Sequence, residues 1–155
     1  MLLYLMRHGE AASPQNDPEC GLTDKGKSKI SKLAAHVQLQ GMEFKQIYHS
    51  KKKRALQTAE IMRNVVSPEA TILLHNYIAP NDDPEIIFSE IDHWTDDTLI
   101  TSHLPFVPNL LTMLTGQDAY LTAITFETGT LVCLEKNENN QWQIKWATAP
   151  SEIGL

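Results

Sequence analysis

The sequence is poor in the features that mark several large protein classes. Among 155 residues there are only two cysteines, Cys20 and Cys133, and their separation fits neither a disulfide framework nor a close pair of metal ligands. No apolar run approaches the roughly 18 residues of a membrane span. Basic residues are in deficit, with a formal net charge of −6, which argues against a general nucleic-acid binder. We therefore expect a soluble cytoplasmic protein that binds neither nucleic acid nor membranes.

Signs of a domain boundary are missing as well. No repeat, low-complexity tract or linker rich in proline, glycine and serine interrupts the chain. Residues 1–155 are therefore expected to form a single domain, long enough to bury a real core. Nothing in the pattern indicates an interface between copies, so a monomer is the default expectation.

What the chain does have is a regular alternation of strand-like and helix-like segments, which is typical of an α/β protein. Strands are predicted at residues 2–6, 44–48, 70–74 and 98–101, and helices at residues 24–40, 54–66, 84–94 and 105–114. The last quarter is predicted to be β-rich, at residues 120–126, 130–134 and 142–146. The pattern predicts an α/β sandwich, with a sheet of mixed edges and helices on both faces.

Three of the predicted strands end in residues that suit phosphate chemistry. The segments after these ends are Arg7-His8-Gly9, His49-Ser50 with Arg54 following, and Ser102-His103. Open α/β sheets bind ligands at the carboxyl ends of their strands. There, a neutral imidazole can attack phosphorus, a guanidinium can hold oxygens, and glycine can admit a close approach. Each residue alone has an ordinary structural explanation, but together they favour phosphoryl transfer.

In this order the blocks resemble the histidine phosphatase superfamily, whose fold is named for phosphoglycerate mutase. The motifs that carry the resemblance are Arg7-His8-Gly9, Ser50-x-x-x-Arg54-Ala55-x-Gln57-Thr58 and Ser102-His103. The short length, the Leu22-Thr23-x-x-Gly26 step and Ser102-His103-Leu104-Pro105-x-Val107 narrow it to the SixA type, the small bacterial phosphohistidine phosphatases. The likeness covers roughly residues 2–114. It implies a phosphoglycerate mutase-like three-layer α/β/α sandwich with a mostly parallel sheet.

The resemblance also implies roles for four catalytic residues. His8 would be the nucleophile and become transiently phosphorylated, while Arg7, Arg54 and His103 would bind the phosphoryl oxygens. The two arginines should disfavour the cationic form of His8. The same guanidiniums would neutralise charge on the transferred group, so neither a metal nor a cofactor is expected.

Supporting roles are expected for three further residues. A backbone carbonyl near Gly9 could fix the tautomer of His8 by accepting its other ring proton. Ser50 could contribute a hydroxyl to the pocket or cap the following helix. Ser102 is expected to support the phosphate site beside His103.

The sequence has no clear equivalent of a general acid. Many superfamily members carry a carboxylic acid for this task, and here the candidates are Asp82, Asp83 and Glu85. A surface turn with a helix cap explains the same three residues. An imidazole leaving group has a conjugate-acid pKa of ~6.5 and needs less acid help than an alkoxide. A site without the acid would therefore favour phosphohistidine over phosphate monoesters.

Two local features leave alternatives open. SixA-type sequences usually have Arg-Pro-Leu-Thr where this chain has Cys20-Gly21-Leu22-Thr23, and loss of that arginine could lower activity or change the substrate. Cys20 itself could be a redox-sensitive thiol or an inert surface residue. The run Lys51-Lys52-Lys53 is either an ordinary solvated face or a basic rim that steers a phosphorylated carrier toward His8.

The leading hypothesis for function is a phosphohistidine phosphatase. Its partner would be a phosphohistidine-containing signalling or phosphocarrier protein, such as a histidine phosphotransfer domain. The first alternative is a phosphatase or mutase of a small phosphorylated metabolite, although a mutase needs an enclosure for which this chain has little spare sequence. The second alternative is a non-catalytic phosphoprotein-binding module.

Overall fold

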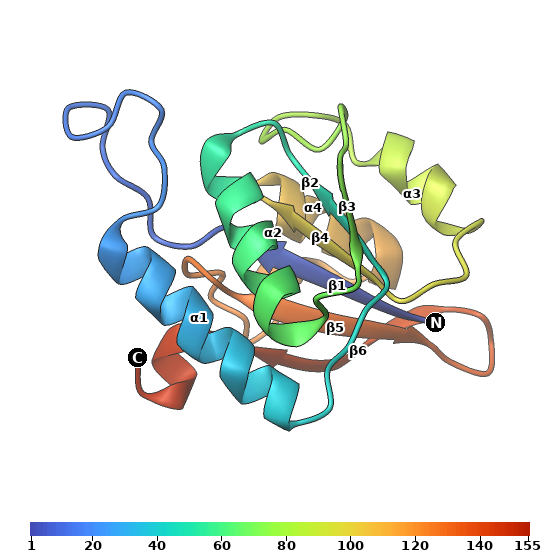
Figure 1. Cartoon of the computed structure of the whole chain (residues 1–155). Helices are drawn as coiled ribbons and strands as arrows, with labels where there is room; N and C mark the ends of the chain where they lie inside the picture. Colours follow the sequence, from blue (N-terminus) through green and yellow to red (C-terminus); the bar gives the residue numbers. More distant parts are fainter.

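The computed structural model describes all 155 residues and contains one six-stranded sheet in the order β3-β2-β4-β1-β5-β6 (Figure 1). The strands are β1 (Leu2–Arg7), β2 (Gln46–His49), β3 (Thr71–Leu74), β4 (Thr98–Ser102), β5 (Leu131–Lys136) and β6 (Trp142–Thr148). The helices are α1 (Asp24–Leu39), α2 (Lys53–Val66), α3 (Glu85–Ile91) and α4 (Phe106–Thr115), with short 3₁₀ turns η1 (Ala119–Leu121) and η2 (Pro150–Ile153).

The sheet is parallel across its first four positions and antiparallel at one edge. β1 runs parallel to β4, β4 to β2 and β2 to β3, whereas β5 runs antiparallel to both β1 and β6. The predicted mostly parallel sheet with a mixed edge is thus confirmed. Parallel pairing brings the carboxyl ends of β1, β4, β2 and β3 to one edge of the sheet, which is where α/β folds place ligand sites.

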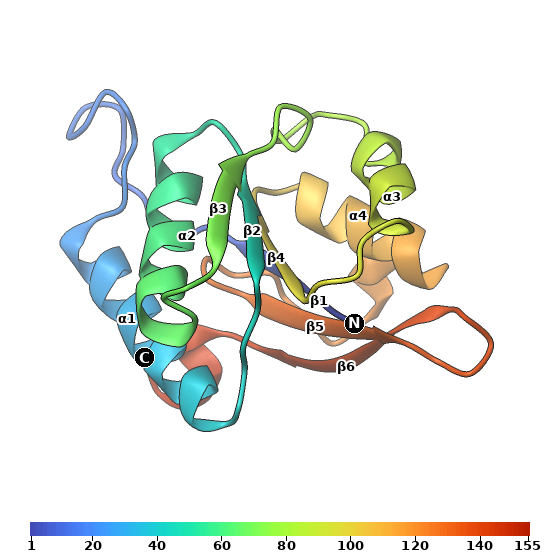
Figure 2. The ribbon, with the colours of Figure 1, turned by 45° about the vertical axis from the view of Figure 1, so that its right-hand side comes forward.

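Helices cover both faces of the sheet and give the predicted three layers (Figures 1 and 2). Successive β1 residues point to opposite faces: Leu3 and Leu5 join one apolar cluster, and Tyr4 and Met6 join the other. The first cluster contains the inner faces of α3 and α4, and the second those of α1 and α2. The central strands are buried on both faces, which explains why β1 and β4 lack a strand-like alternation of polar residues.

The start of α1 shows how the chain after β1 is held in place. The hydroxyl of Thr23 accepts a hydrogen bond from the Gly26 N–H at 2.9 Å and caps the helix. A Cβ at Gly26 would lie 2.2 Å from the carbonyl oxygen of Glu10, so only glycine lets that backbone cross the first turn. Thr23 also donates its backbone N–H to the same Glu10 carbonyl. Thr23 and Gly26 therefore hold the end of the loop between β1 and α1 against Glu10, near the start of the same loop.

One predicted segment is wrong. Residues 120–126 do not form a strand; they contain the turn η1 and irregular backbone. The Asp118 carboxylate accepts the Tyr120 N–H and starts the turn, and Phe126 adopts φ of 54°, outside the strand region. Phe126 is still buried in a core cluster. Its apolar side chain therefore packs in the core without the hydrogen-bond ladder of a strand.

No helix in the chain combines the length and apolar character that crossing a bilayer requires.

Candidate active site

The three segments that were predicted to suit phosphate chemistry lie together at the carboxyl edge of the sheet. β1 lies beside β4 with Arg7 opposite Ser102, and the His8 N–H donates to the Ser102 carbonyl at 3.0 Å. The imidazole rings of His8 and His103 thereby come to 5.1 Å between their centroids. β2, which ends at His49, pairs with the opposite side of β4. The strand order thus brings together segments that lie about a hundred residues apart in the sequence.

His8 is held as a neutral imidazole with one nitrogen free. Its Nδ1 lies 2.7 Å from the carbonyl oxygen of Gly9, and because a carbonyl can only accept, Nδ1 carries the proton and Nε2 keeps its lone pair. The side chain is buried, and the pKa of His8 is lowered to about 4, mainly because burial disfavours the charged form. The charges of Arg54 and Arg7 contribute to this lowering, and the hydrogen bond to Gly9 opposes it. His8 is therefore uncharged and able to act as a nucleophile at neutral pH.

A buried threonine that the sequence analysis did not single out fixes the segment after the nucleophile. The Gly9 N–H donates to Thr58 Oγ1 at 3.0 Å, and the same hydroxyl donates to the Arg54 carbonyl at 2.8 Å. A Cβ at Gly9 would lie 2.7 Å from Ile30 on α1. The absence of a side chain at Gly9 therefore makes room for α1. The sequence analysis had instead expected glycine to allow a close approach to the substrate. The Gln57-Thr58 pair in the motif around Arg54 was the available signal for this role.

Two guanidiniums lie at the site without an anionic partner. Arg7 donates from Nη1 to the Phe126 carbonyl at 2.8 Å, which orients its fork. Arg54, in the first turn of α2, is half-buried and close enough for its charge to lower the pKa of Arg7, His8 and His103. Neither arginine takes part in any of the four ion pairs of the chain. Two cations without anionic partners beside a neutral imidazole suit an anionic ligand such as a phosphoryl group.

His103 is buried and hydrogen-bonded to Ser50, with 2.5 Å between Nε2 and Oγ. The pKa of His103 is lowered to about 3, mainly by burial and in smaller part by the proximity of His8 and Arg54. The Ser50 hydroxyl therefore lies inside the site. It also accepts the Lys52 N–H at 3.4 Å, although α2 has no side-chain cap. Ser102 contributes differently, because its hydroxyl donates to the Ile78 carbonyl at 2.6 Å and anchors the loop after β3.

Residues 3–74 match the sequence model of the histidine phosphatase superfamily (branch 1). In this region, just under half of its length, the chain is similar to members of this superfamily. No curated protein matches the sequence at a significant level.

Solved structures agree with this superfamily fold over the full length of the chain. The protein histidine phosphatase SixA, complexed with tungstate, superposes with a TM-score of 0.85 at 23% identity, and 99% of each chain is covered. A putative phosphohistidine phosphatase SixA from Agrobacterium tumefaciens gives a TM-score of 0.79 at 22% identity over 96% of this chain and 97% of that one. A putative alpha-ribazole-5'-P phosphatase from Escherichia coli gives 0.67 at 16% identity, over 97% and 98%.

The candidate acids lie in the loop that follows β3 and at the start of α3. Asp82 accepts the Ala79 N–H at 2.8 Å, and Asp83 accepts the Glu85 N–H at 2.9 Å. Glu85 is exposed at the first position of α3. None of the three carboxylates is hydrogen-bonded to Arg7, His8, Arg54 or His103. The bonds of Asp82 and Asp83 match the turn-and-cap interpretation of this segment.

The loop between β1 and α1 runs beside the start of α2 (Figure 1). Lys53 of α2 forms an ion pair with Glu19 at 3.2 Å, and Gln57 accepts the Leu22 N–H at 2.7 Å. Cys20, which stands where SixA-type sequences usually have arginine, is half-buried with φ of 50°. The Cys20 N–H donates to the Asp17 carbonyl at 2.9 Å, so its backbone lies in a turn of the loop that contacts α2.

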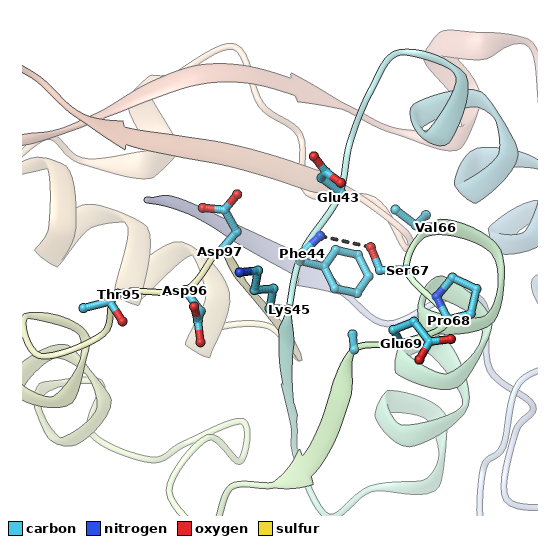
Figure 3. A pocket seen from close by; sticks show the side chains of 11 residues that line it. Glu43, Phe44, Lys45, Val66, Ser67, Pro68, Glu69, Thr95, Asp96 and Asp97 are labelled. Atoms are coloured by element: carbon cyan, nitrogen blue, oxygen red, sulfur yellow. Dashed lines mark hydrogen bonds between the residues drawn. The ribbon is translucent and has the colours of Figure 1, made fainter.

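A cavity of about 680 Å³ lies at the opposite edge of the sheet. Figure 3 shows that it is lined from the starts of β2 and β4 and from the end of α2. Several of its polar atoms are already used: Ser67 accepts the Phe44 N–H, and Asp97 accepts the Leu2 N–H. It does not include the superfamily motif. No group of three or more His, Cys, Asp or Glu side chains is arranged to hold a metal ion.

Proposed function

We propose that this chain is a phosphohistidine phosphatase that removes the phosphoryl group from a phosphohistidine-bearing signalling or phosphocarrier protein. The observation that carries the proposal is the state of His8. It is buried and neutral, it donates Nδ1–H to the Gly9 carbonyl, and it lies beside two arginines without anionic partners. Such an imidazole is ready to take a phosphoryl group on Nε2.

In the first step the Nε2 lone pair of His8 forms a bond to phosphorus while the bond from phosphorus to the substrate imidazole breaks. The departing imidazole leaves as a neutral group once its second nitrogen carries a proton. In the second step water attacks phospho-His8, the bond from phosphorus to Nε2 breaks, and the water proton stays with inorganic phosphate. The proton held on Nδ1 by Gly9 means that His8 also leaves as a neutral imidazole. The enzyme therefore returns to its starting state without an added proton.

Charge stabilisation falls to the side chains around His8. Arg7 and Arg54 would hold the phosphoryl oxygens through charge-assisted hydrogen bonds as charge spreads over them. The neutral imidazole of His103, positioned by the Ser50 hydroxyl, would add a further contact. Preorganised groups of this kind stabilise the transition state because they need no reorientation during the reaction.

The preference for phosphohistidine over a phosphate monoester follows from the leaving group. Imidazole needs little acid assistance, and the candidate carboxylates Asp82 and Asp83 accept hydrogen bonds from their own loop. The fold shared with structures described as protein histidine phosphatase SixA supports the same substrate class.

The test is phosphate release from a phosphorylated histidine phosphotransfer domain, with a metal chelator present. Wild type is compared with His8→Ala, and p-nitrophenyl phosphate is run in parallel as a monoester. We expect fast release from phosphohistidine that His8→Ala abolishes, together with poor monoester cleavage. Unchanged release in His8→Ala would refute the covalent mechanism. Turnover of neither substrate, with tight binding of a phosphate analogue, would instead identify a phosphoprotein-binding module.

A second candidate is a phosphatase of a small phosphorylated metabolite. The structural likeness to the putative alpha-ribazole-5'-P phosphatase favours it. A screen of metabolite phosphates distinguishes the two: a metabolite cleaved with higher kcat/KM than the phosphoprotein would replace the first proposal. Good monoester cleavage would also call for Asp82→Asn, Asp83→Asn and Glu85→Gln variants to locate the acid.

A further inference from the structure

Two lysines next to the site carry charge that no carboxylate of the chain balances. Lys51 to Lys53 directly follow Ser50 at the end of β2, and all three are exposed. Lys53 forms an ion pair with Glu19. Lys51 and Lys52 form no ion pair in the chain. They therefore extend the positive charge of the site outward to the protein surface.

Exposed apolar side chains lie along the same edge of the sheet. Leu74, which is 49% exposed, ends the edge strand β3 opposite His49 of β2. Tyr77 follows three residues later and is 52% exposed, and Leu104, directly after His103, is 37% exposed. β3 has no strand on its outer side. Figure 2 shows the segments after β2, β3 and β4 together at one end of the sheet.

The strand order sets the arrangement of these side chains. Along the edge, the end of β3 with Leu74 comes first, then the end of β2 with Lys51, then the end of β4 with Leu104. Neighbouring strands are about 4.8 Å apart, so the three ends span roughly 10 Å. Apolar and basic groups therefore alternate within the footprint of one small protein surface, next to the catalytic imidazoles.

Charge balance indicates what this edge would face. A phosphoryl group carries about −2, which the two arginines of the site match. Lys51 and Lys52 are then left without a partner, although the chain as a whole has a net charge of −6. A small phosphorylated molecule would leave the exposed leucines uncovered. A protein with carboxylates and apolar side chains around its phosphorylated histidine would pair with the lysines and cover the exposed leucines.

We propose that Lys51, Lys52, Leu74, Tyr77 and Leu104, called here the rim, form the docking surface for the phosphohistidine-bearing substrate protein. The inference rests on the proposed function and adds the recognition of its partner. The lysines steer an acidic partner surface toward the site and raise the rate of encounter. The apolar members provide contact area once the partner is seated. The rim thereby selects phosphoprotein over free phosphoramidate.

The experiment measures kcat/KM for two substrates: a phosphorylated histidine phosphotransfer domain with acidic residues beside its histidine, and phosphoimidazole. The readout is the ratio of the two values at low salt. In Lys51→Glu/Lys52→Glu we expect this ratio to fall about tenfold or more. The difference should shrink at 0.5 M salt, where the screening length is only a few Å. Leu74→Ser and Leu104→Ser should raise KM for the phosphoprotein at both salt concentrations.

The matched control is Lys32→Glu/Lys45→Glu. It makes the same charge change at exposed lysines on α1 and at the opposite edge of the sheet. This control should keep the wild-type ratio. Lys51→Gln/Lys52→Gln, with a smaller effect in the same direction, separates charge loss from misfolding, which thermal unfolding of each variant also checks.

The outcomes separate the two proposals. If wild type hydrolyses phosphoimidazole and the rim variants keep the same ratio as the control, the docking inference is wrong and the proposed function stands. If wild type hydrolyses neither substrate, the proposed function fails and the docking inference fails with it. A charge-reversed phosphotransfer domain that restores the rate of Lys51→Glu/Lys52→Glu would establish direct contact.

Discussion

His8 should remain a neutral nucleophile well into the acid range. A free histidine with a pKa of ~6.5 is only about 3% neutral at pH 5. With a pKa of about 4, the His8 side chain is about 90% neutral at the same pH. The structure thus predicts a roughly thirty-fold larger fraction of nucleophile at pH 5 than an exposed histidine would provide. Burial is the main cause of the low pKa, so Arg54→Gln should raise the midpoint only part of the way.

The assay is an NMR titration of the His8 Cε1–H resonance between pH 3.5 and 8, assigned by its loss in His8→Asn. The chain unfolded in urea provides the reference titration, with a midpoint near the ordinary histidine value. A folded-state midpoint near that of the unfolded chain would refute the assignment of a buried neutral nucleophile. A low midpoint in wild type that does not change in Arg54→Gln would show that the arginine lies too far from His8 to hold the same phosphoryl group.

Three further predictions concern stability and positioning. Gly26→Ala should destabilise the fold by about 3 kcal/mol in urea unfolding, because its Cβ would meet the Glu10 carbonyl and this clash outweighs the usual helix preference for alanine of about 1 kcal/mol; a stabilised variant would contradict the crossing geometry. Thr58→Val keeps the shape but leaves the buried Gly9 N–H unpaired, so we expect a loss of about 1–3 kcal/mol and a lower kcat, with stopped-flow turnover as the check. The pKa of His103 is lowered to about 3 in the folded state, so the unfolded chain binds more protons below pH ~6.5. His103 alone should therefore lower stability by about 2 kcal/mol between pH 8 and pH 5, in addition to the loss caused by the low pKa of His8. A His103→Gln variant that loses as much stability as wild type over this range would refute the contribution of His103.

Much of the fold could be predicted because its elements satisfy local and global requirements together. The apolar run of β1 ends at Arg7, and the helical spacing of Ile30, Leu33 and Val37 continues to the stop near Gly41. In such segments the periodicity of buried residues and the end signals coincide. The motif residues at the strand ends followed from the same elements, since parallel strands bring those ends to one edge.

The remainder depends on contacts between distant segments. Residues 120–126 were predicted to be β-rich from their apolar and β-branched residues. Their conformation depends instead on the cap at Asp118 and on the packing of Phe126 in the core. The Arg7 guanidinium also donates a hydrogen bond to the Phe126 carbonyl. The hydrogen bond from Gly9 to Thr58 and the ion pair of Lys53 with Glu19 each join residues more than thirty positions apart in the sequence. No local pattern reports such partners.

The position of β4 between β1 and β2 has a consequence for the nascent chain. When the ribosome has made only the first 97 residues, His8 and Arg54 both exist, but the strand that links their parent strands has not yet been synthesised. A chain that ends there cannot bring His8 and Arg54 together. The proposed site should therefore bind phosphate only after β4 has inserted and the Phe126 carbonyl has met Arg7, so phosphate binding would signal that the sheet has closed its central gap.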